Sequence, residues 1–89
     1  MKFAWDDNKA IANLKKHGVS FEVATEAFSD ELSATFSDPD HSVNEMRLIT
    51  YGIATNGKLL VIAHVEQADT IRIISARFAT FQERKRYEI

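Results

Sequence analysis

The dipeptide Asn56-Gly57 constrains the fold of this chain more than any other feature of its sequence. Asn-Gly between two alternating apolar stretches is the strongest short-range signal for a β-hairpin, because both residues tolerate the positive φ angles of tight turns. Residues 45–55 and 58–67 are such stretches, so we expect two antiparallel strands joined by a two-residue loop. A third strand over residues 70–76 follows a short turn at Ala68-Asp69, which extends the hairpin to a meander.

The first third of the chain predicts a short strand and two helices. We expect an edge strand over residues 2–5 and a helix over residues 8–17, capped by Asp6 or Asp7. Gly18 suits the left-handed residue that commonly ends a helix. The helix face that we expect against the core carries Ala10, Ile11 and Leu14.

A second helix is expected to follow the N-cap Ser20 and to run to about Asp30. A strand over residues 33–37 then leads into the turn Asp38-Pro39-Asp40-His41, and a last helix covers residues 79–88. The predicted fold class is α+β, a small antiparallel sheet with two N-terminal helices and a C-terminal helix. Since two helices cover one face of such a sheet, we expect the other face to be more open.

Length and composition exclude several classes of protein. The chain has 89 residues, of which 45% are hydrophobic and 27% charged, as in ordinary globular proteins. We expect a single domain over residues 1–89, with a core too small for a large enclosed cofactor. The absence of cysteine excludes disulfides, thiolate metal sites and cysteine nucleophiles, and we expect no cofactor or metal. With no signal peptide and no long apolar run, we expect a soluble cytoplasmic protein without membrane contact.

Charge is distributed unevenly along the chain, although the formal net charge is only −2. Residues 22–46 contain seven acidic residues and no Lys or Arg, whereas residues 47–89 carry a net charge of +3. This asymmetry predicts one surface that meets an anion such as RNA and another that meets a basic partner. Ordinary scatter of charge over a small surface is the alternative interpretation.

Four charged residues have the chemistry that RNA cleavage needs. Arginine binds phosphate through a planar fork, and Glu45 or a histidine would serve as the base. Glu45 and Arg47 lie two residues apart, so a regular strand would place them on one face. Arg72 and Arg77 differ in parity and would face opposite sides, unless the chain changes direction at the end of the strand. A weak surface ion pair between Glu45 and Arg47 is the structural alternative.

Three further features have both a functional and a structural interpretation. His64 lies within a predicted strand, where a catalytic histidine competes with a core histidine. The turn Asp38-Pro39-Asp40-His41 matches no metal-binding spacing, and turn chemistry explains its aspartates. The basic cluster Arg84-Lys85-Arg86 is either a solvated helix face or a contact for RNA near Arg77.

Two groups of residues together carry a resemblance to a known family. The first group opens the chain: Trp5-Asp6, Lys9, Asn13, Lys16-His17-Gly18-Val19-Ser20-Phe21 and Ala24. The second group comprises Glu45-x-Arg47, Gly52, Ile71-Arg72-Ile73-Ile74-Ser75-Ala76-Arg77, Ala79, Glu83 and Tyr87. The chain resembles the BrnT family of type II toxins over nearly its whole length, and the loop over residues 31–44 carries little of the resemblance.

The resemblance implies a RelE-like fold and a ribonuclease activity that halts translation. It also implies neutralisation by a BrnA-type antitoxin. The complex is expected to bind operator DNA only through this antitoxin. The positions carried over are Glu45, Arg47, Arg72, Arg77, Glu83 and Tyr87. We assign to catalysis Arg72, Arg77, Glu45, Arg47 and His64. We assign to substrate binding Arg77, Glu83, Tyr87 and Arg84.

The favoured mechanism is metal-independent cleavage in which Arg72 and Arg77 bind the scissile phosphate. Glu45 is expected to place Arg47 as a further contact. The structural alternative is that Arg72 and Arg77 fasten the last helix by pairing with the carboxylates of Glu83 and Asp69.

Two questions about function and partner stay open at this point. The rival function is a non-catalytic protein that binds the antitoxin and tunes repression, and direct DNA binding is less favoured because no recognition helix is evident. We expect the antitoxin to cover the arginines with acidic residues. A basic antitoxin segment on residues 22–46 is the alternative.

Overall fold

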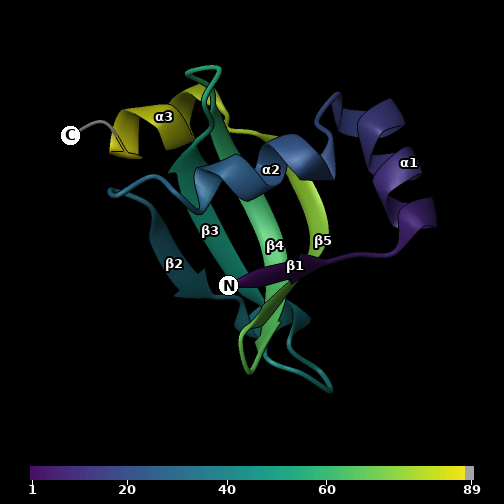
Figure 1. The fold of residues 1–89 in the computed structure, drawn as a ribbon. Coiled ribbons are helices and arrows are strands. Elements are labelled where there is room, and N and C mark those ends of the chain that lie inside the picture. Colours follow the sequence, from purple (N-terminus) through teal and green to yellow (C-terminus); the bar gives the residue numbers. More distant parts are fainter. Residues whose placement is uncertain (88–89) are drawn as a thin grey trace.

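The computed structural model describes residues 1–87 and shows a five-stranded mixed sheet with three α-helices (Figure 1). The strands are β1 (Lys2–Ala4), β2 (Ala34–Ser37), β3 (Leu48–Ile53), β4 (Leu59–Gln67) and β5 (Thr70–Phe78). The helices are α1 (Asp7–His17), α2 (Phe21–Ala27) and α3 (Phe81–Tyr87), with a single 3₁₀ turn at Pro39–His41. The strand order is β1-β5-β4-β3-β2. The predicted α+β class is therefore confirmed, and the kinship with RelE-like folds stays a prediction.

β3, β4 and β5 form the predicted antiparallel meander. The turn between β3 and β4 contains Asn56-Gly57, and Gly57 has the left-handed φ of 81°. The loop is longer than expected. Ala54 N–H donates to Lys58 O at 3.0 Å and Gly57 N–H donates to Ala54 O at 2.9 Å, so residues 55–57 separate the paired ends. A three-residue loop with a left-handed glycine is the next most common hairpin after the two-residue type.

We had expected a purely antiparallel sheet. The sheet is mixed instead, because β1 pairs in parallel with β5. Phe3 lies opposite Ile71, so the first strand of the chain meets the last one. Parallel partners are joined by long connections, and no turn signal in the sequence marks such a pair. β1 reaches only residues Thr70, Ile71 and Arg72 of β5 and leaves the rest of its outer edge without a strand.

A side chain of α1 meets that remaining edge. The buried Asn13 donates through Nδ2 to Ala76 O at 2.8 Å and to Val19 O at 2.9 Å, and its Oδ1 accepts from Ala76 N–H at 3.1 Å. The amide thus pairs with the backbone as a neighbouring strand would. The predicted core face of α1 is wrong in part. Ile11 and Leu14 are 57% and 52% exposed, because the helix turns Asn13 toward the sheet.

The helix ends follow the predicted capping chemistry. Asp6 caps α1 and Ser20 caps α2, each through a side-chain oxygen that accepts from first-turn amides. Gly18 ends α1 in the left-handed conformation. α2 stops at Ala27, earlier than the predicted end at Asp30.

α1 and α2 cover one face of the sheet, and the hydrophobic core lies between the helices and the strands (Figure 1). Phe21 from α2 packs here with Leu60 and Ile62 of β4. The contact of α2 with β3 is very close at Gly52, where an added Cβ would lie 2.3 Å from the Ala27 carbonyl oxygen. Only glycine permits this approach, which explains its place in the sequence.

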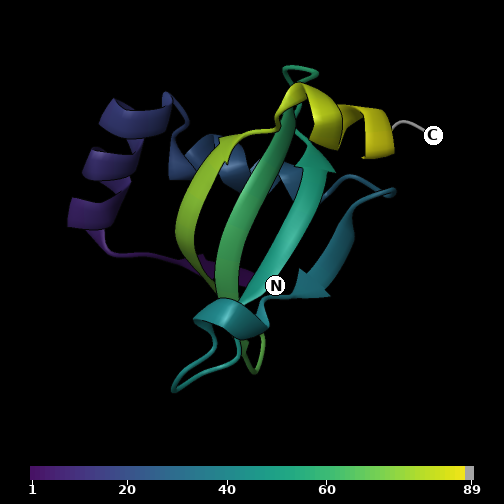
Figure 2. The ribbon, with the colours of Figure 1, turned by 180° about the vertical axis from the view of Figure 1, so that it is seen from behind.

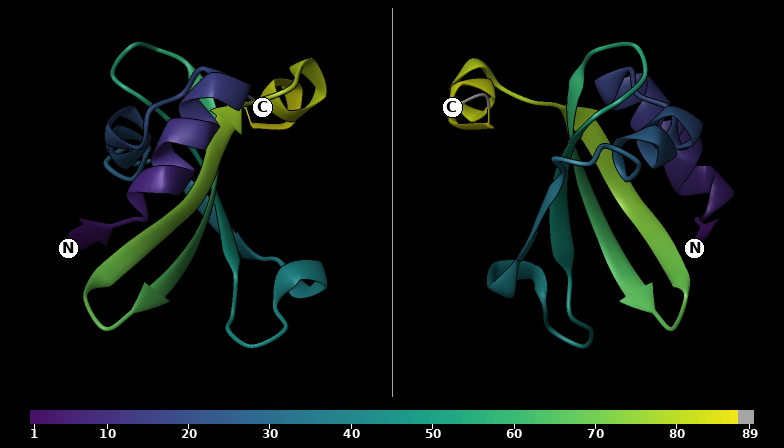
Figure 3. Two further views of the ribbon diagram at one scale, coloured as in Figure 1. Left: turned by 90° about the vertical axis from the view of Figure 1, so that its right-hand side faces the viewer. Right: turned by 60° about the vertical axis from the view of Figure 1, so that its left-hand side comes forward.

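The opposite face of the sheet is open at its centre, as Figure 2 shows. Seen edge-on, α3 and the segment of residues 38–47 lie on this face at its two ends (Figure 3). The last helix begins at Phe81, two residues later than predicted, and the predicted end at residue 88 lies outside the described residues. No helix among residues 1–87 has the length and apolar character that crossing a bilayer requires.

A bulge in β5 decides which side chains face this open surface. Ala63 pairs with Ser75 and His64 pairs with Ile73, so Ile74 has no partner and the parity of β5 changes there. Arg72 and Arg77 pair with Val65 and Val61, which have the same parity on β4. Both arginines therefore project from the open face, against the expectation for a regular strand.

Replacement of Asn13 by Ala is expected to lower the free energy of unfolding by about 2–4 kcal/mol, because Ala76 N–H and two carbonyl groups lose buried hydrogen-bond partners. Urea unfolding followed by circular dichroism measures the change. The matched control is Asn8→Ala, on the exposed side of the same helix. Equal stability of the two variants would contradict the role of Asn13.

Candidate functional site

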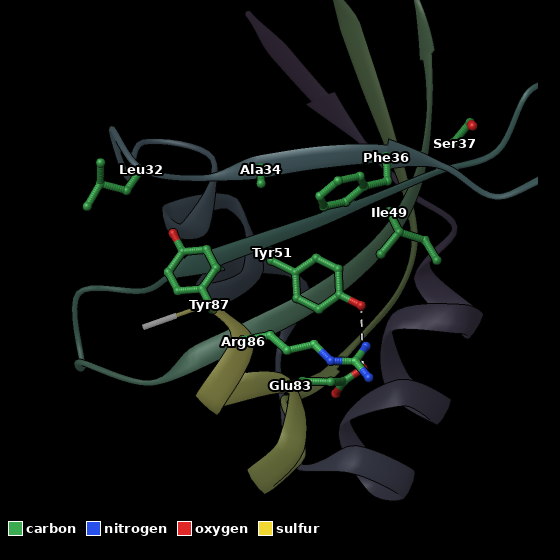
Figure 4. A pocket seen from close by; sticks show the side chains of 9 residues that line it. All are labelled: Leu32, Ala34, Phe36, Ser37, Ile49, Tyr51, Glu83, Arg86 and Tyr87. Atoms are coloured by element: carbon green, nitrogen blue, oxygen red, sulfur yellow. Dashed lines mark hydrogen bonds between the residues drawn. The ribbon is translucent and has the colours of Figure 1, made fainter. Parts of the chain in front are cut away.

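Two adjoining cavities occupy the open face. The larger has a volume of about 560 Å³ and lies between α3 and the strands β2 and β3 (Figure 4). It is lined by Leu32, Ala34, Phe36, Ser37, Ile49, Tyr51, Glu83, Arg86 and Tyr87. The smaller, of about 210 Å³, is lined by Asp38, His41, Arg47, Ile49, Val61, Ala63, Ser75 and Arg77. Because Ile49 lines both, the two cavities form one hollowed surface.

Arg77 and Glu83 form a two-point ion pair next to α3. Arg77 Nη1 lies 2.8 Å from Glu83 Oε1, and Nη2 lies 3.0 Å from Oε2. The hydrogen bonds from Arg77 lower the pKa of Glu83 to about 2, and the same pair raises the pKa of Arg77 above its ordinary value. Half of the structural alternative is thus confirmed, since Arg77 does fasten the last helix.

Glu83 also organises the start of α3. Thr80 N–H donates to Glu83 Oε1 at 2.8 Å and Glu83 N–H donates to Thr80 Oγ1 at 3.2 Å, the reciprocal pattern of a capping box. Figure 4 shows the Tyr51 hydroxyl aimed at this carboxylate, to which it donates at 3.4 Å. Burial raises the pKa of Tyr51, so its hydroxyl keeps its proton at neutral pH.

The other end of α3 is fastened by Tyr87. Its hydroxyl donates to Asp30 Oδ2 at 2.7 Å, and its ring lines the larger cavity. Burial, reinforced by Asp30, raises the pKa of Tyr87 to about 12, and the hydrogen bond from Tyr87 lowers the pKa of Asp30. Tyr87, which we predicted to contact the substrate, therefore also holds the end of α3 through its hydrogen bond to Asp30.

Arg47 is the cation of the smaller cavity that has no fixed partner. In the described part of the chain it forms no salt bridge, and its buried Nε has no hydrogen-bond partner. It precedes β3, because that strand begins at Leu48 and not at residue 45 as predicted. A guanidinium that lines a cavity and has no carboxylate partner is suited to an anionic ligand.

The prediction that Glu45 places Arg47 is wrong, because Glu45 pairs with Arg72. Arg72 Nη2 lies 2.7 Å from Glu45 Oε1, and both side chains are 42% exposed. Arg72 does not line the smaller cavity, and its partner position on β4 is about 13 Å along the strand from that of Arg77. The two arginines therefore face the same way but belong to different parts of the open face.

His64 does not share a site with the arginines, contrary to its assignment to catalysis. It is fully buried on the helix-covered face, where its Nε2 bonds to Thr50 Oγ1 at 2.7 Å and Phe28 packs edge-on against its ring. Burial lowers the pKa of His64 to about 4, so the ring is neutral at physiological pH. The structure thus gives His64 the buried, hydrogen-bonded environment of a core histidine.

The basic cluster of α3 is divided between two sides of the helix. Arg84 is exposed and lies over the ring of Phe81, outside both cavities, whereas Arg86 lines the larger cavity. We had assigned Arg84 to substrate binding, but the basic residue of α3 that faces the open surface is Arg86. Helical spacing would have separated them, since α3 meets the sheet through Glu83 and Tyr87.

Sequence reasoning missed four polar residues of the open face. Tyr51 and Ser75 come from strands, and Asp38 and His41 come from the turn whose aspartates we attributed to turn chemistry. Tyr51 shares its parity with Ile49, a signal that was available once β3 was identified. Ser75 was hidden by the bulge. Among residues 1–87 no group of three or more His, Asp or Glu side chains is placed to hold a metal ion.

A family model described as the ribonuclease toxin BrnT of type II toxin-antitoxin systems matches residues 5–83. The chain belongs to this family. The matched range contains Glu45, Arg47, Arg72, Arg77 and Glu83 and ends before Arg84 and Tyr87.

The structural comparison agrees with the family. The fold is similar to that of the ribonuclease toxin BrnT from Brucella abortus, known from a 1.1 Å crystal structure, with a TM-score of 0.71 and 26% sequence identity. The similarity covers 90% of this chain and 97% of the Brucella chain. No curated protein matches this sequence significantly. The BrnT fold thus extends over nearly all of the described residues.

The pair of Arg77 and Glu83 makes stability depend on pH. The pKa of Glu83 is lowered from 4.5 to about 2, so its stabilisation is complete above pH 4.5 and is lost as the pH falls through 2. Because Arg77 is 40% exposed, we discount for solvent and expect Glu83→Gln to cost about 2 kcal/mol at pH 7. Urea unfolding at pH 7 and at pH 2 measures the difference between parent and variant, which should fall well below its pH 7 value at the lower pH, where Glu83 is about half protonated. The exposed Glu66→Gln is the control, and equal losses in both variants would refute the ion pair.

Proposed function

We propose that this BrnT-family chain is a metal-independent endoribonuclease that acts in the cytoplasm and inhibits translation by cutting RNA. In this proposal the open face of a RelE-like scaffold binds the RNA, and a BrnA-type antitoxin neutralises the activity and links the complex to operator DNA. Membership of a ribonuclease toxin family supports the reaction class.

The observation that carries the proposal is the smaller cavity, which Arg47 and Arg77 line together. Cleavage by the neighbouring 2′-oxygen forms a crowded phosphorane with additional negative charge. Two guanidinium groups around one cavity are suited to stabilise that charge, the role that a bound metal takes in other nucleases. Ser75 adds a hydroxyl group to the same wall.

The three arginines receive different roles from their contacts. Arg47 contacts the scissile phosphate directly, because its side chain lines the cavity and forms no salt bridge in the described structure. Arg77 keeps both terminal nitrogens on Glu83, so it contributes charge from a fixed position. Arg72 lies outside the cavity and is proposed to meet a neighbouring phosphate of the RNA chain, in place of Glu45.

In the reaction, the 2′-oxygen bonds to phosphorus while the bond between phosphorus and the 5′-oxygen breaks. The products are a 2′,3′-cyclic phosphate and a free 5′-hydroxyl. The cavity binds the non-bridging oxygens as their charge increases, and this differential binding is the source of the rate enhancement.

Replacing Arg47 by Lys is expected to slow RNA cleavage about a hundredfold, because lysine keeps the charge but loses the bidentate fork. Cleavage of a labelled RNA by the purified chain in the presence of a chelator measures the rate, and mass spectrometry of the products should find the cyclic phosphate. Arg84→Lys, outside both cavities, is the control. Parent rates in Arg47→Lys, or inactivity of the parent upon chelation alone, would contradict the proposal.

Arg77 needs a second comparison because it also fastens α3. If its only role is that of the ion pair, Arg77→Lys and Glu83→Gln lose the same fraction of activity. If it also stabilises the phosphorane, Arg77→Lys loses considerably more.

The same ion pairs favour one rival function, a non-catalytic antitoxin-binding protein that acts as co-repressor. Arg72 and Arg77 are both held by carboxylates, as expected of structural arginines. Absence of cleavage by a folded chain that still binds its antitoxin would establish this rival.

The antitoxin is proposed to cover the open face with acidic residues opposite Arg47, Arg77 and Arg86. Amide exchange of the complex should then show protection in β3, β5 and α3. Protection confined to residues 22–46, which hold seven acids and no Lys or Arg, would instead indicate a basic antitoxin segment.

A further inference from the structure

One pair of polar residues in the smaller cavity has no part in the function proposed so far. His41 Nδ1 lies 2.9 Å from Asp38 Oδ2, within the turn around Pro39. The Asp38 side chain is only 15% exposed, whereas that of His41 is 64% exposed. Both residues line the cavity that contains Arg47 and Arg77.

The turn is tied to Arg47 by two hydrogen bonds, and a third lies within the turn. Asp38 N–H donates to Arg47 O at 2.9 Å, and Arg47 N–H donates to Ser42 Oγ at 2.9 Å. The Ser42 hydroxyl in turn donates to Asp38 O at 2.6 Å. The backbones that carry the imidazole and the unpartnered guanidinium are therefore joined at one corner, which brings both side chains to the same cavity before any ligand binds.

We propose that His41 is the general base of the cleavage reaction and that Asp38 is its positioning residue, an inference that rests on the ribonuclease function proposed above. A carboxylate that accepts from Nδ1–H fixes the neutral imidazole in the tautomer whose Nε2 carries a free lone pair. Asp38 is the more buried partner and holds the ring, and His41 is exposed to a substrate.

The proton balance of the step is complete without a further group on the protein. His41 Nε2 takes the proton of the 2′-hydroxyl as the 2′-oxygen bonds to phosphorus. The 5′-oxygen leaves with its electron pair and takes a proton from water. The imidazolium then returns its proton to the solvent, which restores the enzyme.

A purely structural role would explain the 2.9 Å contact between His41 and Asp38, but not why the pair lies in the cavity that the two arginines line. An exposed interaction between residues three apart in a turn contributes little to stability, about 1 kcal/mol or less. The turn chemistry of Asp and Pro accounts for residues 38–40 without any need for histidine at position 41. The position of His41 beside two arginines is what requires another explanation.

The test compares His41→Ala with the parent enzyme in single-turnover cleavage of a labelled RNA. We expect the rate to fall about a hundredfold or more, the usual contribution of a general base. Affinity for an uncleavable RNA with a 2′-deoxy residue at the cleavage site should stay at the parent value. Added imidazole should restore part of the rate in His41→Ala, which a structural histidine would not show.

Matched variants separate this role from a general effect on the turn. Asp40→Asn changes a neighbouring residue that does not line the cavity, and His17→Ala removes a distant histidine on α1, so both should keep the parent rate. Asp38→Asn should slow cleavage less than His41→Ala. If His41→Ala unfolds, His41→Gln replaces it, and the same rate loss is expected.

A substrate with sulfur in place of the leaving 5′-oxygen separates a base from an acid, because the thiolate leaves without a proton. The loss in His41→Ala should persist on this substrate, and its disappearance would overturn the assignment of His41 as base. Parent rates in His41→Ala and His41→Gln, together with slow cleavage by Arg47→Lys, would overturn the dyad alone. A parent chain that cleaves no RNA would refute the proposed function, and with it the dyad.

Discussion

The pairing of the Asn13 side chain with the backbone of Ala76 controls the geometry of the open face. β1 reaches only the first three residues of β5, and the bulge at Ile74 breaks the regular pairing with β4. After Arg72 the outer edge of β5 has no neighbouring strand in the described structure, and only β4 pairs with it. The amide of Asn13 supplies both a donor and an acceptor to Ala76, so the residue before Arg77 has a fixed orientation. A helix on the covered face thus determines the direction of a side chain on the opposite one.

The open face uses its charges for two purposes. Arg77 and Glu83 fasten α3 to the sheet, and Tyr51 and Thr80 complete the hydrogen bonds of Glu83. This network gives α3, a helix of only seven residues, a position that its own length does not stabilise. Arg47 is excluded from the network, forms no salt bridge in the described structure and lines the cavity beside it. The structure therefore distinguishes a cation that maintains the fold from one that is available to a ligand.

Local sequence signals predicted the elements well and their relative placement less well. Asn56-Gly57, Asp6, Ser20 and Gly18 act through neighbouring residues, and each has its predicted role. The parallel pairing of β1 with β5 is a contact between the ends of the chain and leaves no local trace.

The site was harder to predict because it depends on irregularities. An alternation rule assigns Arg72 and Arg77 to opposite faces, and only the bulge at Ile74 brings them to one. Glu45 and Arg47 precede β3, so the alternation of side chains along a strand does not determine where they point. Glu45 forms its ion pair with Arg72. For His64 the strand pattern could not tell whether the ring is buried or exposed, and the structure places it in the core below the helices.

The parallel pairing of β1 with β5 also has a consequence for the order of folding during synthesis. The first strand leaves the ribosome well before its partner β5 has been made. Contacts between such distant segments carry the largest loop-closure entropy and form late. Arg77 and Glu83 lie still further along the chain than the residues that pair with β1. The open face of a nascent chain therefore stays incomplete until β5 and α3 have also left the ribosome.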